Sequence, residues 1–145
     1  MIVVDASAIV AMLTREPDAD TLVSALAASG RAETTPIAIY EAVLGLSRKR
    51  QWSVAEAETH VGDFLRAAGV VMQPIQPETV HRALEAFARY GKGRGHPARL
   101  NLGDCFTYAQ AKGRRRVASL QRRRFLGDGH RERVLSGHRF LCARI

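Results

Sequence analysis

The segment Met1-Ile2-Val3-Val4-Asp5-Ala6-Ser7 begins the chain with a short apolar run that ends at an acid. Four consecutive apolar residues bounded by a polar turn are typical of a parallel strand buried on both faces. The apolar residues from Ala8 to Leu13 follow at once and predict a first helix. The segment therefore predicts a buried strand that carries Asp5 at its carboxyl end and leads directly into a helix.

Helix and strand signals alternate through the residues that follow. Pro17 suits the first turn of a second helix, which Gly30 ends, and the stretch from Thr34 to Ile37 is expected to be extended. Ser53 and Glu56 have the spacing of a capping box. Expected helices cover 38–50, 53–68, 77–90 and 105–112, with a strand at 70–72. This alternation predicts an α/β fold of three layers with a mainly parallel central sheet, whose site lies beyond the carboxyl ends of the strands.

The composition is that of one globular domain. The 145 residues are 46% hydrophobic but only 6% aromatic, so we expect an aliphatic core. No apolar run approaches the roughly 20 residues of a membrane-spanning helix, and we expect no membrane association. The start of the chain has no basic leader, which predicts a cytoplasmic location. Cys105 and Cys142 form no motif and are expected to be reduced, structural thiols.

The net charge of +8 lies entirely in the C-terminal segment. Residues 1–112 contain twelve Lys or Arg and twelve Asp or Glu, whereas residues 113–145 contain ten Arg and two acids. We therefore divide the chain into a neutral body, 1–112, and an Arg-rich tail, 113–145. Within the body, the loop from Gly91 to Pro97 mixes glycines with basic residues, and it is either a contact for RNA phosphates or a solvated loop.

Three acids of the body are candidates for a functional site. Asp5 follows the first expected strand, Asp104 stands at the start of the last expected helix, and Glu41 lies within an apolar stretch of a helix. Asp5 and Asp104 could each cap a helix, and Glu41 could point to solvent from an otherwise apolar helix. Ser7 is either a turn hydroxyl or a group that holds a metal-bound water. Taken together, the carboxylates are hard oxygen ligands suited to Mg²⁺ or Mn²⁺. Two such ions about 4 Å apart can activate a water and stabilise the leaving oxygen of a phosphodiester.

Four segments carry a family resemblance. The segments are Ile2–Ile9 (IVVDASAI), Glu41–Val43 (EAV), Arg89–Gly93 (RYGKG) and Leu100–Ala109 (LNLGDCFTYA). The body thereby resembles the PIN-domain ribonuclease toxins of the VapC type, and the last motif is the most specific. The resemblance implies a PIN-like three-layer α/β/α fold and a metal-dependent endoribonuclease. It further implies the toxin of a type II toxin–antitoxin module, a homodimer neutralised by a VapB-type antitoxin.

The resemblance also assigns roles to single residues. Asp5, Glu41 and Asp104 would be catalytic ligands of Mg²⁺ or Mn²⁺, with Ser7 in support. One alternative is a catalytically impaired PIN protein that binds antitoxin or RNA without cleavage. Another is an α/β phosphotransferase with Asp5 as nucleophile, although that class usually has a second acid where Ser7 stands.

The tail departs from the family pattern. The family carries a further short strand and a G-D-D-F-x-x-T-D-I segment, whose last acid is the fourth site carboxylate. The tail contains no such motif, and Val117 to Leu120 is its last strand candidate. Shifting the codons of Arg122 to Glu132 forward by one nucleotide can spell that motif, so we hypothesise that the tail is out of frame from about Gly113. The alternative is a genuine basic RNA-binding tail. Asp128 or Glu132 would replace the fourth acid only if the tail folds back onto the body, and we do not expect either to do so.

Overall fold

The computed structural model describes residues 1–113, 134–135 and 138–141. Helices and strands alternate as expected for an α/β protein. In chain order they are β1 (Ile2–Val4), α1 (Ala6–Thr14), α2 (Ala19–Ala27), β2 (Ala32–Thr34), α3 (Pro36–Arg50), α4 (Val54–Ala67), β3 (Val70–Met72), α5 (Pro77–Tyr90), α6 (Leu102–Gly113), β4 (Val134–Leu135) and β5 (His138–Leu141).

The sheet has the strand order β3-β2-β1-β5-β4, with β1 at its centre. Strand β1 pairs in parallel with both β2 and β5, β3 extends the parallel sheet from β2, and β4 alone runs antiparallel. The chain thus adds strands first on one side of β1 and later on the other. In such sheets, ligands bind beyond the carboxyl ends of the strands where the order reverses. Asp5, which follows β1 directly, lies at that position.

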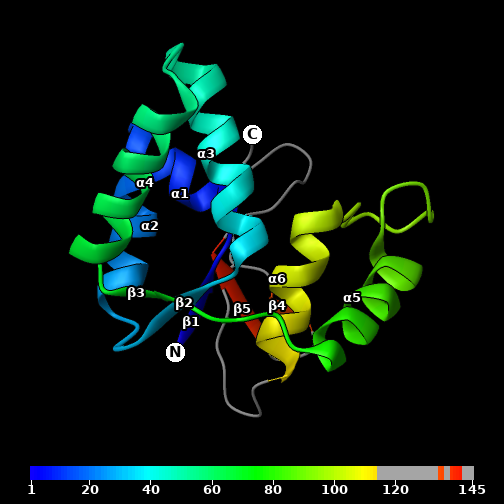
Figure 1. The fold of residues 1–145 in the computed structure, drawn as a ribbon. Helices are drawn as coiled ribbons and strands as arrows, with labels where there is room; N and C mark the ends of the chain where they lie inside the picture. Colours follow the sequence, from blue (N-terminus) through cyan, green and yellow to red (C-terminus); the bar gives the residue numbers. More distant parts are fainter. Residues whose placement is uncertain (114–133, 136–137, 142–145) are drawn as a thin grey trace.

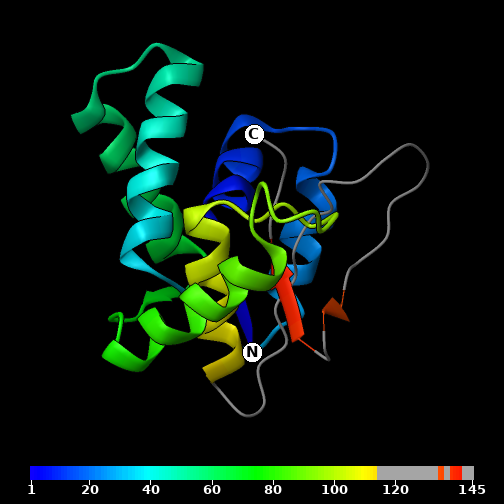
Figure 2. The ribbon, with the colours of Figure 1, turned by 90° about the vertical axis from the view of Figure 1, so that its right-hand side faces the viewer.

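Alternating side chains of β1 build two separate cores, one on each face of the sheet. Ile2 and Val4 pack into a cluster formed mainly by α1, α2, α3 and α4, whereas Val3 packs with residues of α5 and α6. Figures 1 and 2 show α5 and α6 on the opposite side of β1 and β2 from the first four helices. The three-layer α/β/α fold with a mainly parallel sheet is therefore confirmed, and both cores are largely aliphatic.

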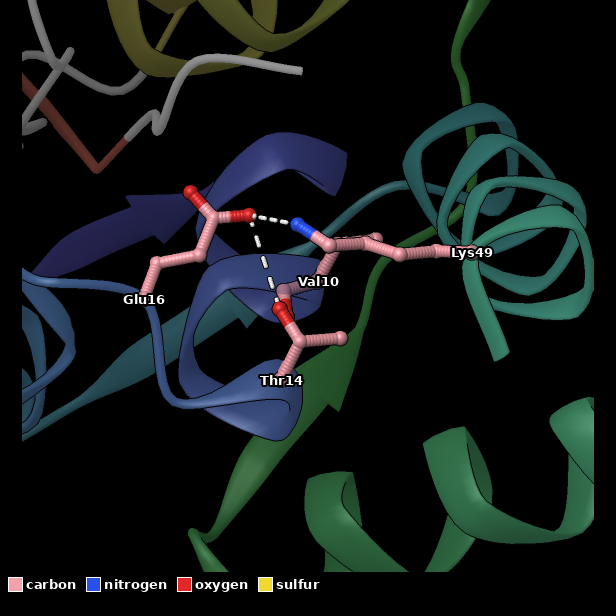
Figure 3. A network of polar contacts seen from close by, with 4 residues as sticks. All are labelled: Val10, Thr14, Glu16 and Lys49. Atoms are coloured by element: carbon pink, nitrogen blue, oxygen red, sulfur yellow. Dashed lines mark hydrogen bonds and ion pairs between the residues drawn. The ribbon is translucent and has the colours of Figure 1, made fainter.

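A polar network links α1 to α3 at the edge of the first core (Figure 3). The Thr14 hydroxyl donates to the carbonyl of Val10 at 2.9 Å and to the Glu16 carboxylate at 3.5 Å, and Lys49 pairs with the same carboxylate. The network lies where α1 has just ended and α3 is about to end. It adds a polar contact to the core packing between α1 and α3, the helix that carries Glu41.

Several expected boundaries are confirmed and others were wrong. The capping box of Ser53 and Glu56 is present at the start of α4. Helix α3 begins at Pro36, because the Thr35 hydroxyl caps it by accepting from the Ala38 amide at 3.1 Å, so the expected extended stretch is shorter. Pro17 was expected in the first turn of the second helix, but α2 begins two residues later, at Ala19. The last helix of the body was expected from residue 105, but α6 begins at Leu102.

The tail contains strand β5, which the sequence analysis did not identify. The sequence HRFL of this strand does not predict a strand by itself, because half of its residues are polar or charged. The strand is recognised from its parallel pairing with β1. The candidate strand Val117 to Leu120, the frame-shifted segment and the substitute acids Asp128 and Glu132 lie outside the described residues. The division of the chain at residue 112 stays a prediction.

Among the helices that the structure describes, none is long and apolar enough to cross a membrane.

Candidate active site

Asp5 is a buried carboxylate held from two directions. It is 4% exposed and caps α1, since its Oδ2 accepts from the Ser7 amide at 3.3 Å and the Ser7 hydroxyl at 3.0 Å. Its Oδ1 accepts from the Thr107 hydroxyl at 2.9 Å. The capping role considered for Asp5 is confirmed. The same bonds fix the orientation of the carboxylate, as supporting groups around metal ligands do.

Glu41 lies near Asp5 and is destabilised as a charged group. Burial raises the pKa of Glu41, the negative charge of Asp5 raises it further, and a hydrogen bond from the Gly103 amide opposes both effects. Glu41 is half-buried on α3, so it does not simply point to solvent from an apolar helix. Two carboxylates that repel each other in a partly buried place are a site at which a cation is stabilising.

Gly103 lets the Glu41 carboxylate approach the backbone of α6 closely. A Cβ atom on residue 103 would lie 1.9 Å from Glu41 Oε2 and 2.7 Å from its Cδ. Gly103 is buried in the first turn of α6. The absence of a side chain therefore lets the backbone amide of residue 103 reach the carboxylate, which also brings the start of α6 to the Asp5 and Glu41 pair.

Asp104 follows Gly103 but does not cap α6 itself. Its Oδ2 accepts from the Asn101 amide at 2.8 Å, and its own amide donates to Asn101 Oδ1 at 2.8 Å. These reciprocal bonds have the pattern of a capping box in which Asn101 is the capping residue. The expectation that Asp104 is the cap was therefore wrong, because the helix begins two residues before it.

The four predicted site residues are only partly brought together. Asp5 contacts Ser7 and lies near Glu41, whereas Asp104 is joined to them through its neighbour Gly103. Within the described part of the chain, no three His, Cys, Asp or Glu side chains are grouped closely enough to hold a metal ion by themselves. A metal at this site would consequently rely on few protein ligands, as Mg²⁺ commonly does when substrate phosphates complete its coordination.

Cys105 is protonated at neutral pH in the metal-free protein. The thiol is buried and free, and burial together with the charge of Asp104 raises its pKa to about 12. Because the thiolate is the form that binds metals and attacks substrates, a thiol with such a pKa is inert. The expected structural role of Cys105 agrees with this environment, and Cys142 lies outside the described residues.

Sequence reasoning missed the roles of Thr107, Gly103 and Asn101. All three lie within or beside the segment that carried the strongest resemblance. Thr107 stands three residues after Asp104, hence on nearly the same face of α6, and it is a buried polar residue between Phe106 and Tyr108. That spacing was a usable signal, but its partner is 102 residues away and only the fold identifies it.

Comparisons with known proteins identify the family of this chain. The PIN-domain family model matches residues 2–118. A VapC ribonuclease of Rhizobium meliloti is 42% identical over 120 residues, which cover 75% of this chain and 84% of that protein. A ribonuclease VapC of Mycolicibacterium smegmatis is 40% identical over 111 residues, covering 76% and 82%.

A solved structure shares the fold. The crystal structure of VapC20 from Mycobacterium tuberculosis, a sarcin–ricin loop cleaving toxin, superimposes with a TM-score of 0.60 at 15% identity, covering 78% of this chain and 82% of that one. The family match extends from β1, which leads into Asp5, through α6, which carries Asp104 and Thr107. The chain therefore belongs to the PIN-domain family and is of the VapC type.

Proposed function

We propose that this protein is a metal-dependent endoribonuclease and the toxin of a type II toxin–antitoxin module. The observation that carries the proposal is the buried Asp5 carboxylate, which Ser7 and Thr107 hold beside Glu41. Burial raises the pKa of Glu41, and the charge of Asp5 raises it further. The two carboxylates lie beyond the carboxyl end of the central strand, where ligands of α/β sheets bind. The relatives named as ribonucleases support the reaction class.

The donor set fits a hard divalent cation. Asp5 and Glu41 would hold Mg²⁺ or Mn²⁺, because carboxylate oxygens are the ligands that these ions prefer. Asp104 is the third ligand that the family resemblance implies. Such an ion supplies an activated water and stabilises the leaving oxygen of a phosphodiester. The raised pKa of Glu41 fits this role, since a bound cation would offset both the burial and the charge of Asp5 that oppose ionisation of Glu41.

The other residues of the site orient these acids. Ser7 and Thr107 hold the Asp5 carboxylate from opposite oxygens, and the Gly103 amide holds Glu41. Each donor belongs to a helix that is packed into one of the two cores. The carboxylates are thereby prepared for a cation before it binds, which reduces the cost of ordering them.

The partners that we propose are an RNA substrate, a VapB-type antitoxin and a second copy of the chain. Support for the homodimer comes from α5, where Val80 and Leu84 are 42% and 64% exposed. Their spacing places them along one side of the helix. A row of exposed apolar side chains on a helix is the kind of surface that a second subunit covers.

Loss of Asp5 tests the enzyme directly. In Asp5→Asn, Mn²⁺-dependent cleavage of RNA should fall by more than the roughly 10- to 100-fold typical for loss of a supporting residue, because a ligand itself is lost. Cleavage is followed on labelled RNA with and without EDTA, beside Asp20→Asn, which makes the same change at an exposed acid on α2. If the folded wild-type protein binds Mn²⁺ but does not cut, the impaired PIN protein is the correct description.

Removal of the Thr107 hydroxyl tests the orientation of Asp5. Thr107→Val keeps the shape of the side chain but removes the 2.9 Å hydrogen bond, so Mn²⁺ affinity should drop by about 10- to 100-fold. Calorimetric titration with Mn²⁺ measures this, and Thr107→Ser should recover most of the affinity. Thr59→Val, at an exposed position of α4, is the matched control. Equal Mn²⁺ affinity of Thr107→Val and wild type would contradict the proposed role.

A methyl group at residue 103 should disturb the site although it improves helix propensity. Gly103→Ala should gain less thermal stability than a glycine replaced in open space, because the added Cβ displaces the Glu41 carboxylate and breaks its hydrogen bond from the residue 103 amide. This loss offsets a propensity gain of at most about 1 kcal/mol. Gly62→Ala, on α4 with no atom within 4 Å of the added Cβ, should raise stability more. Calorimetric melting of both variants checks this, and a Gly103→Ala protein as stable as Gly62→Ala would refute the clash.

The stability of the metal-free protein should depend on the ionisation of Glu41. The pKa of the Glu41 carboxyl is higher in the folded protein than its unfolded value of 4.5, so folding favours the protonated form. The stability that this protonation contributes is fully present below pH 4.5 and is lost as the pH rises through the folded-state pKa. In EDTA, Glu41→Gln should therefore be more stable than wild type at neutral pH, with the difference vanishing in acid. Urea unfolding across this pH range measures it, with Glu58→Gln as the exposed control.

Addition of Mn²⁺ should reverse that order. The wild-type protein gains stability by binding the ion, whereas Glu41→Gln has lost a ligand and gains less. An equal gain in both proteins would show that Glu41 is not a ligand.

A further inference from the structure

We propose that the loop from Gly91 to Leu100, here named the basic loop, binds the sugar–phosphate backbone of single-stranded RNA beside the scissile bond. The inference rests on the proposed ribonuclease function and adds a substrate-binding surface to it. The loop connects α5 to the segment that begins α6. Its shape, charge and position each support the proposal.

The two ends of the basic loop are joined to each other by backbone hydrogen bonds. Gly91 and Leu100 form a parallel bridge in which the Leu100 amide donates to the Tyr90 carbonyl at 2.8 Å and the Lys92 amide donates to the Leu100 carbonyl at 3.0 Å. Leu100 is fully buried in the core beneath α5 and α6. Both ends of the loop are therefore anchored, and its exposed side chains extend from a defined backbone.

Aromatic contacts hold the loop further. The His96 ring lies edge-on against the Tyr90 ring with centroids 4.8 Å apart, and His96 Nδ1 accepts from the Ala98 amide at 3.0 Å. Arg99 adopts a left-handed backbone with φ of 43°, which is unusual for a residue other than glycine. Backbone strain of this kind persists where the surrounding structure determines it. Arg99 stands two residues before Asn101, the cap of α6.

The charge of the loop is concentrated and of one sign. Residues 86–103 contain Arg89, Lys92, Arg94 and Arg99 but no acid, within a body whose charges balance to zero. Lys92, Arg94 and Arg99 are exposed, and none of them takes part in an ion pair with any residue that the structure describes. The nearest preceding acid, Glu85, instead pairs with His81 and Lys112. Cations left unneutralised in this way are available to phosphates.

Arg94 adds a stacking surface to this charge. Its guanidinium lies 5.4 Å from the centre of the Phe87 ring, and Phe87 is 37% exposed. Arginine planes and aromatic rings both stack with unpaired bases, and such surfaces are common in proteins that bind single-stranded RNA. The pair therefore favours a single strand over a duplex as the ligand.

The position of the loop relates it to the carboxylates. The chain runs from Leu100 directly into Asn101 and α6, whose Gly103 contacts Glu41. In Figures 1 and 2, the yellow-green loop precedes the start of α6, at the end of the helix that meets α3. A site built of acids repels RNA by itself. Cations beside it attract the phosphates that flank the scissile bond. An acidic protein would also be attracted to these cations, but it would not use the stacking surface of Arg94 and Phe87, so RNA is the better fit.

The test is the salt dependence of RNA binding. A short fluorescein-labelled single-stranded RNA is titrated in EDTA with full-length Asp5→Asn protein, so that binding is read without cleavage. In that background, Lys92→Gln, Arg94→Gln and Arg99→Gln are combined. Each phosphate contact on a single strand contributes about 0.7 to the slope of log K against log salt, so the slope should fall by about 2 units. The Arg-rich segment is the same in all proteins compared and does not affect the difference.

Arg66→Gln is the matched control, because it removes one exposed cation from α4, on the far side of the sheet from the basic loop in Figure 1. Its slope should equal that of the parent protein, whereas Arg94→Gln alone should lower the slope by about 0.7 units. An unchanged slope in the triple variant overturns the proposal, and so does an equal effect of Arg66→Gln. If wild-type protein cuts no RNA but the triple variant lowers the slope, the nuclease function fails while the binding surface stands.

Discussion

The buried carboxylate of Asp5 is the point on which the two halves of this fold depend. Its Oδ2 is bound by Ser7 at the start of α1, in the first core, and its Oδ1 by Thr107 of α6, in the second. A buried carboxylate that loses such donors is costly, because its charge is then poorly solvated. The hydrogen bonds therefore link the position of α6 to the position of β1 and bring the remaining acids of α3 and α6 toward the same end of the sheet.

The arrangement around Asp5 is electrostatically unfavourable when no cation is bound. Glu41 is half-buried beside a like charge, and one amide donor, Gly103, compensates only in part. Proteins tolerate such destabilised groups where function requires them. Bound to a divalent cation, this site would be stabilised, and the basic loop would attract a polyanion to the acidic centre. The two features are joined through the short segment from Leu100 to Gly103.

The element pattern and the positions of the acids were accessible from the sequence, because each depends on neighbours along the chain. Apolar runs, caps and glycines predicted β1, α4 and α5 closely. Asp5 was recognised as the residue at the end of a buried strand. Boundaries decided by side-chain caps were less accurate, as at Thr35 and Asn101, because a polar residue before a helix can cap at more than one position.

The sequence by itself determined the fold class and the residues that supply carboxylates, since hydrophobic periodicity and residue chemistry are local properties. Only the tertiary structure decided which of these groups meet. Thr107 reaches Asp5 across 102 positions, and Gly103 admits Glu41 because two helices approach closely there. Strand β5 is likewise recognised through its pairing with β1. The physical reason is that these contacts join segments far apart in sequence, and their partners follow from how the sheet and helices pack.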